Sequence, residues 1–184
     1  MYEIIHHYQP QDSFEMKDKE QFEEAIRLFG ESLFDRHPMM HFTASSIIFN
    51  QTFDKILMIY HKMYNSWSWT GGHLDGNQSF LDVALIEAKE ETGLTNIKVL
   101  DEKPISLESL PVWFHIKKGK PISSHLHLNL SFAFVADENE PLILNEEETS
   151  GVKWIDILEY KKYVTEPDMY PIYDKIINRV KKND

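Results

Sequence analysis

The clearest helical pattern in the chain lies between Ser79 and Gly93. Its apolar positions recur with the spacing i, i+3, i+4, i+7 and are Leu81, Ala84, Leu85 and Ala88. That spacing places them on one face of a helix. Ser79 followed three residues later by Asp82 is a capping pair, and Gly93 suits the left-handed residue that ends many helices. The pattern therefore predicts a capped helix with one buried face.

Shorter segments show the patterns of β-strands. They are residues 44–49, 55–60, 96–100, 112–116, 125–135 and 152–155. Turn-forming residues separate the first two, which is hairpin spacing. The fifth alternates strictly, with leucine and phenylalanine on one face and His125, His127, Asn129, Ser131 and Ala133 on the other. Strict alternation predicts a strand that is buried on its apolar face.

Two further helices are predicted near the ends of the chain. Asp18 and Gln21 can cap a helix with the apolar stripe Phe22, Ala25, Ile26, Phe29 and Leu33, which Pro38 ends at the latest. This stripe has to be buried, either on the core domain or in a dimer interface. Residues 156–163 are predicted to be helical, and 170–182 form a C-terminal helix with Pro171 near its first position. His37 and His41 are interpreted as surface or structural residues.

Composition and charge limit the class of protein. The chain has 184 residues, 42% hydrophobic and 27% charged, which suits one well-buried domain. Its net charge of −11 argues against DNA, RNA or an anionic membrane as a partner. It has no cysteine, no signal-peptide pattern at the N-terminus and no apolar run near the roughly 18 residues that span a bilayer. We expect a cytoplasmic protein.

Three glutamates stand on a second face of the helix that follows Ser79. Glu87, Glu90 and Glu91 have the spacing i, i+3, i+4, so their carboxylates repel one another by about 0.2–0.5 kcal/mol per pair. A divalent cation among them would reverse this local electrostatics. Oxygen ligands favour a hard ion, Mg²⁺ or Mn²⁺. The alternative is a solvated acidic helix face.

The stretch from Gly71 to Leu94, GGHLDGNQSFLDVALIEAKEETGL, resembles the signature of the Nudix hydrolase family, G-x5-E-x7-R-E-U-x-E-E-x-G-U with U aliphatic. The positions that match are Gly72, Glu87, Ala88, Glu90, Glu91, Gly93 and Leu94, with Ala88 as a small aliphatic residue. Gln78 and Ile86 replace the usual glutamate and arginine. Because both members of that charged pair are missing, no charge is left without its partner. Their loss puts the orientation of Glu87 in doubt.

The resemblance implies an α/β (α+β) fold, the α/β/α sandwich with a mixed sheet. We expect a domain at residues 43–184 that follows an N-terminal helical extension at 1–42. It also implies that Glu87, Glu90 and Glu91 bind the metal ion, Mg²⁺ or Mn²⁺. Glu90, Glu91 and a glutamate from a later acidic loop are the expected catalytic residues. Glu147 is our choice for that loop residue and Glu148 the reserve.

Six residues are candidates for substrate contacts, and several of them have a second interpretation. They are Gly71, Gly72, His73, Trp69, His125 and His127. The two glycines let the backbone approach phosphates. Trp69 either packs in the core or stacks on a nucleobase, and His73 either contacts substrate or fixes a loop. His125 and His127 contact substrate or support the acidic helix, bind zinc, or simply face solvent.

These observations predict a pyrophosphohydrolase that acts on a small-molecule diphosphate. The first hypothesis is a metal-dependent Nudix hydrolase that cleaves the pyrophosphate linkage in a nucleoside diphosphate joined to another moiety, by attack of water on phosphorus. The second is a Nudix-fold ligand sensor without turnover, suggested by Gln78 and Ile86. The substrate and the general base stay undecided, and a homodimer is left open.

Overall fold

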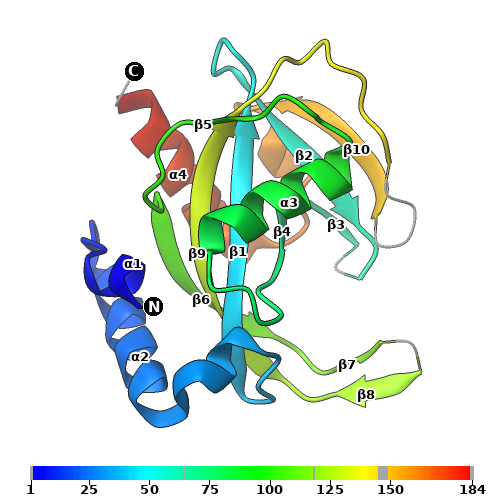
Figure 1. Cartoon of the computed structure of the whole chain (residues 1–184). Coiled ribbons are helices and arrows are strands. Elements are labelled where there is room, and N and C mark those ends of the chain that lie inside the picture. The colour runs from blue at the N-terminus through cyan, green and yellow to red at the C-terminus, as the bar shows by residue number, and fades with distance from the viewer. Residues whose placement is uncertain (1, 64, 118, 145–148, 183–184) are drawn as a thin grey trace.

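A mixed β-sheet forms the centre of the computed structural model, which describes residues 2–63, 65–117, 119–144 and 149–182 (Figure 1). Its main path has the strand order β10-β2-β1-β9-β5, while β3 pairs with β2, β4 with β1 and β6 with β9. Strands β1 and β9 run parallel, whereas the other pairs in this sheet are antiparallel. The predicted mixed sheet is confirmed.

The strands of the sheet and of one separate hairpin have the following bounds. They are β1 Met40–Phe49, β2 Lys55–His61, β3 Ser66–Ser68, β4 Thr70–His73, β5 Lys98–Val99, β6 Ser106–Val112, β7 His115–Lys117, β8 Lys120–Ile122, β9 His125–Val135 and β10 Thr149–Asp156. Strands β7 and β8 pair only with each other among the described residues. The predicted hairpin of β1 and β2, the long alternating strand β9 and the late strand β10 are present.

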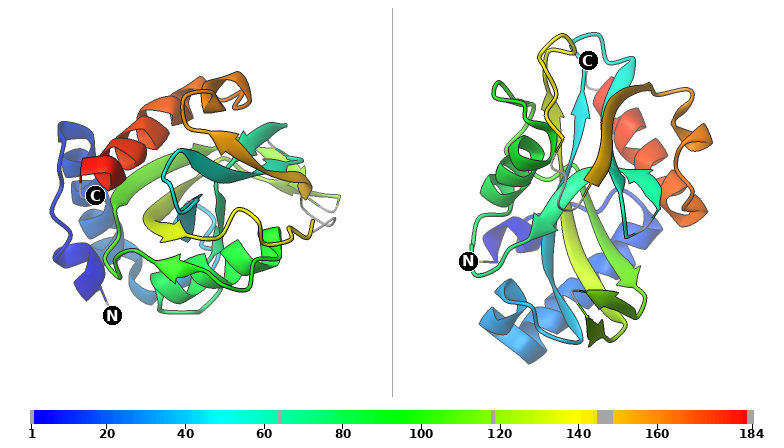
Figure 2. Two further views of the ribbon diagram at one scale, coloured as in Figure 1. Left: turned by 90° about the horizontal axis from the view of Figure 1, so that it is seen from above. Right: turned by 90° about the vertical axis from the view of Figure 1, so that its right-hand side faces the viewer.

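Helices cover both faces of the sheet. They are α1 Glu3–His6, α2 Ser13–Phe29, α3 Phe80–Thr92 and α4 Tyr170–Lys182, with short 3-10 helices at Gly30–Phe34, Tyr160–Lys162 and Pro167–Met169. Figures 1 and 2 show α3 on one face of the sheet and α4 on the other, with α1 and α2 beside them. The predicted α/β/α arrangement with an N-terminal helical segment is therefore confirmed.

Two apolar clusters hold these layers together. The first joins α2 and α3 to the sheet and includes Phe22, Ala84 and Phe132, whereas the second joins α4 to the opposite face and includes Ile47 and Ile176. Each of these side chains is at most 2% exposed. None of the described helices is long and apolar enough to cross a membrane.

Helix α2 begins earlier than the sequence predicted. Its N-cap is Asp12, whose carboxylate accepts hydrogen bonds from the backbone N–H groups of Phe14 and Glu15. The prediction of an Asp18 cap is wrong, because the first free N–H groups lie one turn before it. Phe22 and Ala25 are buried in the first cluster, so the stripe packs on the core domain.

The segment between β6 and β9 also differs from its prediction. A strand was expected over 112–116, but β6 ends at Val112, which pairs with His125, the first residue of β9. Trp113 and Phe114 therefore have no partner strand in that sheet, and they are 76% and 77% exposed. The predicted helix at 156–163 is reduced to a turn and one 3-10 helix, whereas α4 has its predicted bounds.

Candidate active site

The strand β4 packs directly against the acidic face of α3. The backbone N–H of Gly71 donates a hydrogen bond to a carboxylate oxygen of Glu91 at 3.0 Å, and Glu91 is 4% exposed. A Cβ atom on Gly72 would lie 2.1 Å from Oε1 of Glu87. That distance is far below an ordinary contact, so only glycine lets the strand approach the carboxylate this closely. The two glycines therefore bring a backbone edge and two carboxylates together.

Local signals in the sequence explain why α3 presents these carboxylates to β4. The Oγ atom of Ser79 accepts a hydrogen bond from the N–H of Asp82 at 3.2 Å, which fixes the start of the helix. Gly93 has φ +75°, and its N–H donates to the carbonyl oxygen of Lys89. With both ends fixed, Glu87 and Glu91 lie beside the buried Ala88, on the side of the helix that meets β4.

The other acidic candidates have different environments. Glu90 is exposed, and Glu87, Glu90 and Glu91 do not form a group of ligand atoms within 4.8 Å of one another in the described part of the chain. Glu147 and Glu148 lie outside the described residues. The roles predicted for these five glutamates stay predictions.

The two positions that depart from the family signature are on the surface. Gln78 is exposed and Ile86 is 47% exposed, so the missing charged pair leaves no buried gap. Glu87 sits between Gly72 and the body of α3, where its orientation is restrained by the strand. The oxygen ligands of Glu87 and Glu91 fit a hard divalent cation, which keeps several waters and needs few carboxylates.

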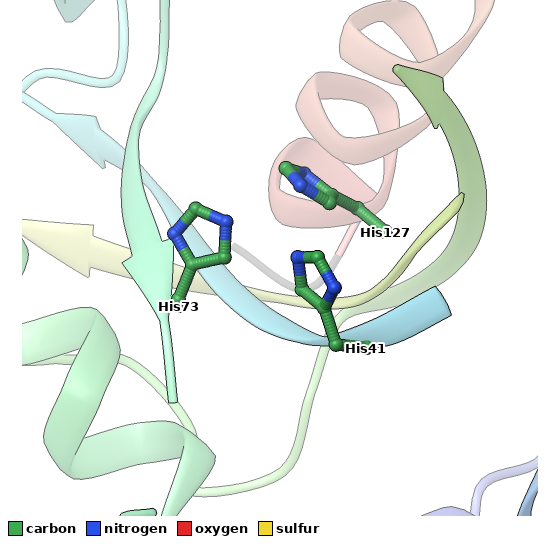
Figure 3. A group of neighbouring side chains, drawn as sticks. All are labelled: His41, His73 and His127. Carbon is green, nitrogen blue, oxygen red and sulfur yellow. The ribbon is translucent and has the colours of Figure 1, made fainter. Parts of the chain in front are cut away.

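The histidine candidates come together at one end of the sheet. Figure 3 shows His41 of β1, His73 of β4 and His127 of β9 gathered around one space. The ring centroid of His41 lies 4.9 Å from each of those of His73, His125 and His127. We call these four side chains the histidine cluster. His41 was interpreted as a surface or structural residue, and only the pairing of β1 with β9 reveals its neighbours.

Burial favours the neutral form of three rings in the histidine cluster, those of His41, His73 and His127. Desolvation is the main cause and neighbouring positive groups add to it, and together they lower the pKa of His73 to about 3 and that of His127 to about 2. Desolvation also lowers the pKa of His41, against a hydrogen bond to a backbone carbonyl that raises it. Neutral imidazoles do not attract a phosphate by charge, so any substrate contact they make is a hydrogen bond.

Trp69 lies against α4. Its ring meets the ring of Tyr173 edge to face at a centroid distance of 5.4 Å, and its backbone N–H donates to the Tyr173 hydroxyl. Both aromatic residues belong to the second apolar cluster or pack against it. This is the environment expected for the core-packing interpretation of Trp69, while its stacking on a nucleobase stays a prediction.

The polar face of β9 is buried beyond its histidines. Asn129 is 1% exposed and accepts hydrogen bonds from the hydroxyls of Thr43 and Ser45, while Ser131 donates to Glu108 of β6. The solvent-facing interpretation of this part of the strand is therefore wrong. These side chains form hydrogen bonds with one another between the sheet and α4, as buried polar groups generally do.

Comparison with known families gives the family of this chain. The family model described as NUDIX domain matches residues 39–177. The chain belongs to the NUDIX domain family. This confirms the membership predicted from Gly72 to Leu94, and with it the general class of Nudix pyrophosphohydrolase. A search of curated proteins gave no match.

Solved structures support the same fold. An Ap4A hydrolase from C. elegans, in a binary complex, has a TM-score of 0.56 and 19% identity, covering 77% of this chain and 98% of its own. A Nudix hydrolase described as putative from Listeria monocytogenes has a TM-score of 0.58 and 19% identity, covering 78% and 96%. The dihydroneopterin triphosphate pyrophosphohydrolase of E. coli has a TM-score of 0.57 and 13% identity, covering 78% and 98%. At these identities the likeness concerns the fold alone.

Proposed function

We propose that this Nudix chain is a divalent-cation-dependent hydrolase that cleaves the pyrophosphate linkage of a nucleoside diphosphate joined to another moiety. The observation that carries the proposal is the contact between β4 and α3, where Gly71 and Gly72 lie directly on Glu91 and Glu87. Dense negative charge on linked phosphates requires oxygen-ligated cations and close backbone donors. The helix supplies the carboxylates, and the strand places its backbone directly beside them.

Glu87, Glu90 and Glu91 are the proposed ligands of Mg²⁺ or Mn²⁺. When bound, such an ion neutralises phosphate charge and lowers the pKa of its water. Glu91 is held in place by the Gly71 N–H, because a charge-assisted hydrogen bond of this kind fixes the carboxylate. Glu90 and Glu91, with Glu147 from the later loop, are the proposed groups that accept the proton of the attacking water.

The residues around this contact have proposed binding roles. Gly71 and Gly72 are the proposed contacts to the diphosphate, because without side chains their backbone lies directly beside the carboxylates. His73 follows them directly, but its side chain is directed to the other face of β4, so substrate contacts of His73, His125 and His127 stay predictions. Trp69 is retained as a candidate for the base. Dimerisation and a cytoplasmic location also stay predictions.

Replacing Glu91 by glutamine tests the proposal. Glu91→Gln keeps the shape of the side chain but removes its charge, so turnover should be abolished. The thermal midpoint should stay the same or rise, because one of three neighbouring like charges is lost. The matched control is Glu102→Gln, at an exposed residue of the loop after β5, which should leave turnover unchanged.

The assay is a screen of nucleotide sugars, dinucleoside polyphosphates, nucleoside triphosphates and ADP-ribose with Mg²⁺ or Mn²⁺. Released phosphate and nucleoside monophosphate are measured for the unmodified chain, Glu91→Gln and Glu102→Gln. If Glu91→Gln retained most of the turnover, the assignment of the carboxylates would be wrong. Binding without release by the unmodified chain across the whole panel would instead support a ligand sensor.

A further inference from the structure

We propose that His41, His73, His125 and His127 form a binding site for a borderline-soft transition-metal ion, with Zn²⁺ as the best fit, separate from the acidic site. The proposal does not depend on the hydrolase activity. It starts from the group of three imidazoles, His41, His73 and His127, whose ligand atoms all lie within 4.8 Å of one another (Figure 3). His125 adds a fourth ring on the same strand as His127.

The sheet topology explains why these residues meet. Strands β1 and β9 run parallel with His41 opposite His127, so both residues lie near the beginnings of their strands. Strand β4 is antiparallel to β1, with His73 opposite Thr43, so its last residue reaches the same end of the sheet. Three strands distant in sequence thus each contribute an imidazole to one point.

His41 presents a nitrogen atom that is suited to a metal ion. Its Nδ1–H donates to the carbonyl oxygen of His37 at 2.9 Å, which leaves the lone pair on Nε2. That Nε2 atom is buried and has no hydrogen-bond partner among the described residues, and His41 is 4% exposed. Histidine ligands of metals commonly donate their second N–H to a backbone carbonyl in this way.

His125 and His127 already show the spacing of a pair of zinc ligands. Nδ1–H of His125 donates to the carbonyl oxygen of Ser123 at 2.8 Å, so its Nε2 also carries a lone pair. That Nε2 lies 3.2 Å from Nε2 of His127. In a tetrahedral zinc site, with bonds of about 2.0–2.1 Å, two ligand nitrogens lie about 3.3 Å apart. The ligand atoms of His41 and His73 lie within 4.8 Å of each other and of His127, so an ion would draw them closer together.

The chemistry of the cluster favours a transition metal over other ligands. Imidazole nitrogens suit zinc, copper, iron and nickel, whereas Mg²⁺ prefers oxygen ligands. The Nε2 atoms of His41 and His125 present lone pairs, because Nδ1 of each ring donates to a backbone carbonyl, and lone pairs suit a cation rather than an anion. Neutral imidazole is the form that binds a metal ion.

The acidic site and the histidine cluster face different sides of β4. Gly72 is directed at Glu87 on α3, and side chains alternate along a strand, so His73 is directed to the opposite face. An ion held by the cluster would connect the ends of β1, β4 and β9. It would thereby fix the strand that carries Gly71 and Gly72.

The test measures Zn²⁺ and Co²⁺ binding to the untagged full chain after treatment with a chelator. We expect one ion per chain by elemental analysis after dialysis, the visible absorption of a tetrahedral Co²⁺ centre, and a nitrogen first shell in zinc X-ray absorption. Zn²⁺ should also raise the thermal midpoint, because a ligand that binds only the folded state stabilises it.

Variants at the two sites distinguish their ions. His41→Gln and His127→Gln should each weaken Zn²⁺ binding at least about 100-fold, since loss of even an outer partner costs about 10–100-fold. The matched control is His115→Gln, on the neighbouring hairpin, where the ring is 6.3 Å from that of His125. Both His115→Gln and Glu91→Gln should bind Zn²⁺ as the unmodified chain does.

Three results would overturn the proposal. They are the absence of stoichiometric Zn²⁺ in the unmodified chain, an oxygen-only first shell, and Zn²⁺ binding that persists in His41→Gln and disappears in Glu91→Gln. Circular dichroism checks that each variant is folded. If a histidine variant fails to fold, the absorption spectra of the unmodified chain decide the matter.

Discussion

Replacing Gly72 by alanine tests whether the contact between β4 and α3 positions the acidic site. The new Cβ atom would lie 2.1 Å from Oε1 and 2.3 Å from Cδ of Glu87. Ordinary contacts between such atoms begin at about 3.4 Å. The carboxylate of Glu87 therefore has to move by about 1 Å or more to admit the methyl group.

The magnitude follows from which atoms must move. The atoms that the new Cβ meets belong to the flexible end of a glutamate side chain, so the carboxylate can swing away. We expect the free energy of unfolding to fall by less than about 1 kcal/mol, within the range of mild packing changes. A misplacement of about 1 Å in a reacting centre costs on the order of 100-fold in rate. Turnover should therefore fall about 100-fold while the fold is retained.

Gly71→Ala is the matched comparison, because its new Cβ would meet backbone instead. It would lie 2.7 Å from the carbonyl oxygen of Ala44 and 2.9 Å from Cα of Ser45 in the neighbouring strand β1. Backbone within a sheet cannot swing away, so this variant should be destabilised by about 1–3 kcal/mol. We therefore expect different effects at the two adjacent glycines: Gly72→Ala should lose activity, whereas Gly71→Ala should lose stability.

The assay measures kcat/KM on the substrate found in the panel, together with urea unfolding, for the unmodified chain and both variants. Full activity in a folded Gly72→Ala variant would refute the reasoning, since Glu87 would then not need its observed position. A large loss of stability in Gly72→Ala, equal to that in Gly71→Ala, would show that the helix and strand cannot adjust as described.

Three further predictions concern the stability of the fold. Glu15→Gln removes a buried carboxylate that forms ion pairs with Arg179 and Lys175, so urea unfolding should show a loss of about 3–5 kcal/mol, and an unchanged midpoint would contradict this. Burial raises the pKa of Glu15, but hydrogen bonds from Arg179, the backbone and Lys175 outweigh it and lower the pKa to about 2, below the ordinary 4.5. Its stabilisation should therefore be complete above pH 4.5 and disappear as the pH falls towards 2; urea midpoints of Glu15→Gln should lack this part of the acid dependence. Gly93→Ala should lower the thermal midpoint by the equivalent of about 1–3 kcal/mol. The reason is that φ is +75° at this residue and the new Cβ would lie 2.5 Å from the Cβ of Ile143. A midpoint equal to that of the unmodified chain would contradict this backbone strain.

The parts of the fold that were predicted correctly depend on local signals. The helix from Ser79 to Gly93 has a cap, a period and a C-cap within one stretch of sequence, and each signal acts on its nearest neighbours. The strand from His125 to Val135 likewise has an uninterrupted alternation. Such elements can be predicted from a short stretch of sequence because their signals act locally.

The errors arose where a short pattern does not determine the structure. The spacing of Asp18 and Gln21 predicted a cap, whereas the first free N–H groups of α2 belong to Phe14 and Glu15 and bond to Asp12. Val112 to Ile116 has the composition of a strand, but the partner strand begins at His125 and leaves Trp113 without a neighbour in the sheet. The pairing of strands cannot be predicted from a short stretch of sequence, because it depends on residues far apart in the chain.

The same limit applies to the sites. The spacing of Glu87 and Glu91 on one helix is visible in the sequence, so the acidic helix could be selected in advance. The histidine cluster requires the parallel register that sets His41 opposite His127, which lie 86 positions apart in the chain. Without that pairing, His41 resembles any histidine near a turn.

Strand β4 bears on the orientation of Glu87, which the altered signature put in doubt. Ile86 takes the place of the arginine that the signature has before this glutamate, and it is 47% exposed. In this chain Glu87 is restrained by the backbone of Gly72, and Glu91 by the N–H of Gly71. His73 continues the same strand into a cluster of imidazoles from β1 and β9. If β4 is fixed at its His73 end, it can position the carboxylates of Glu87 and Glu91 without the missing charged pair. The replacement of arginine by Ile86 is therefore compatible with the proposed acidic site.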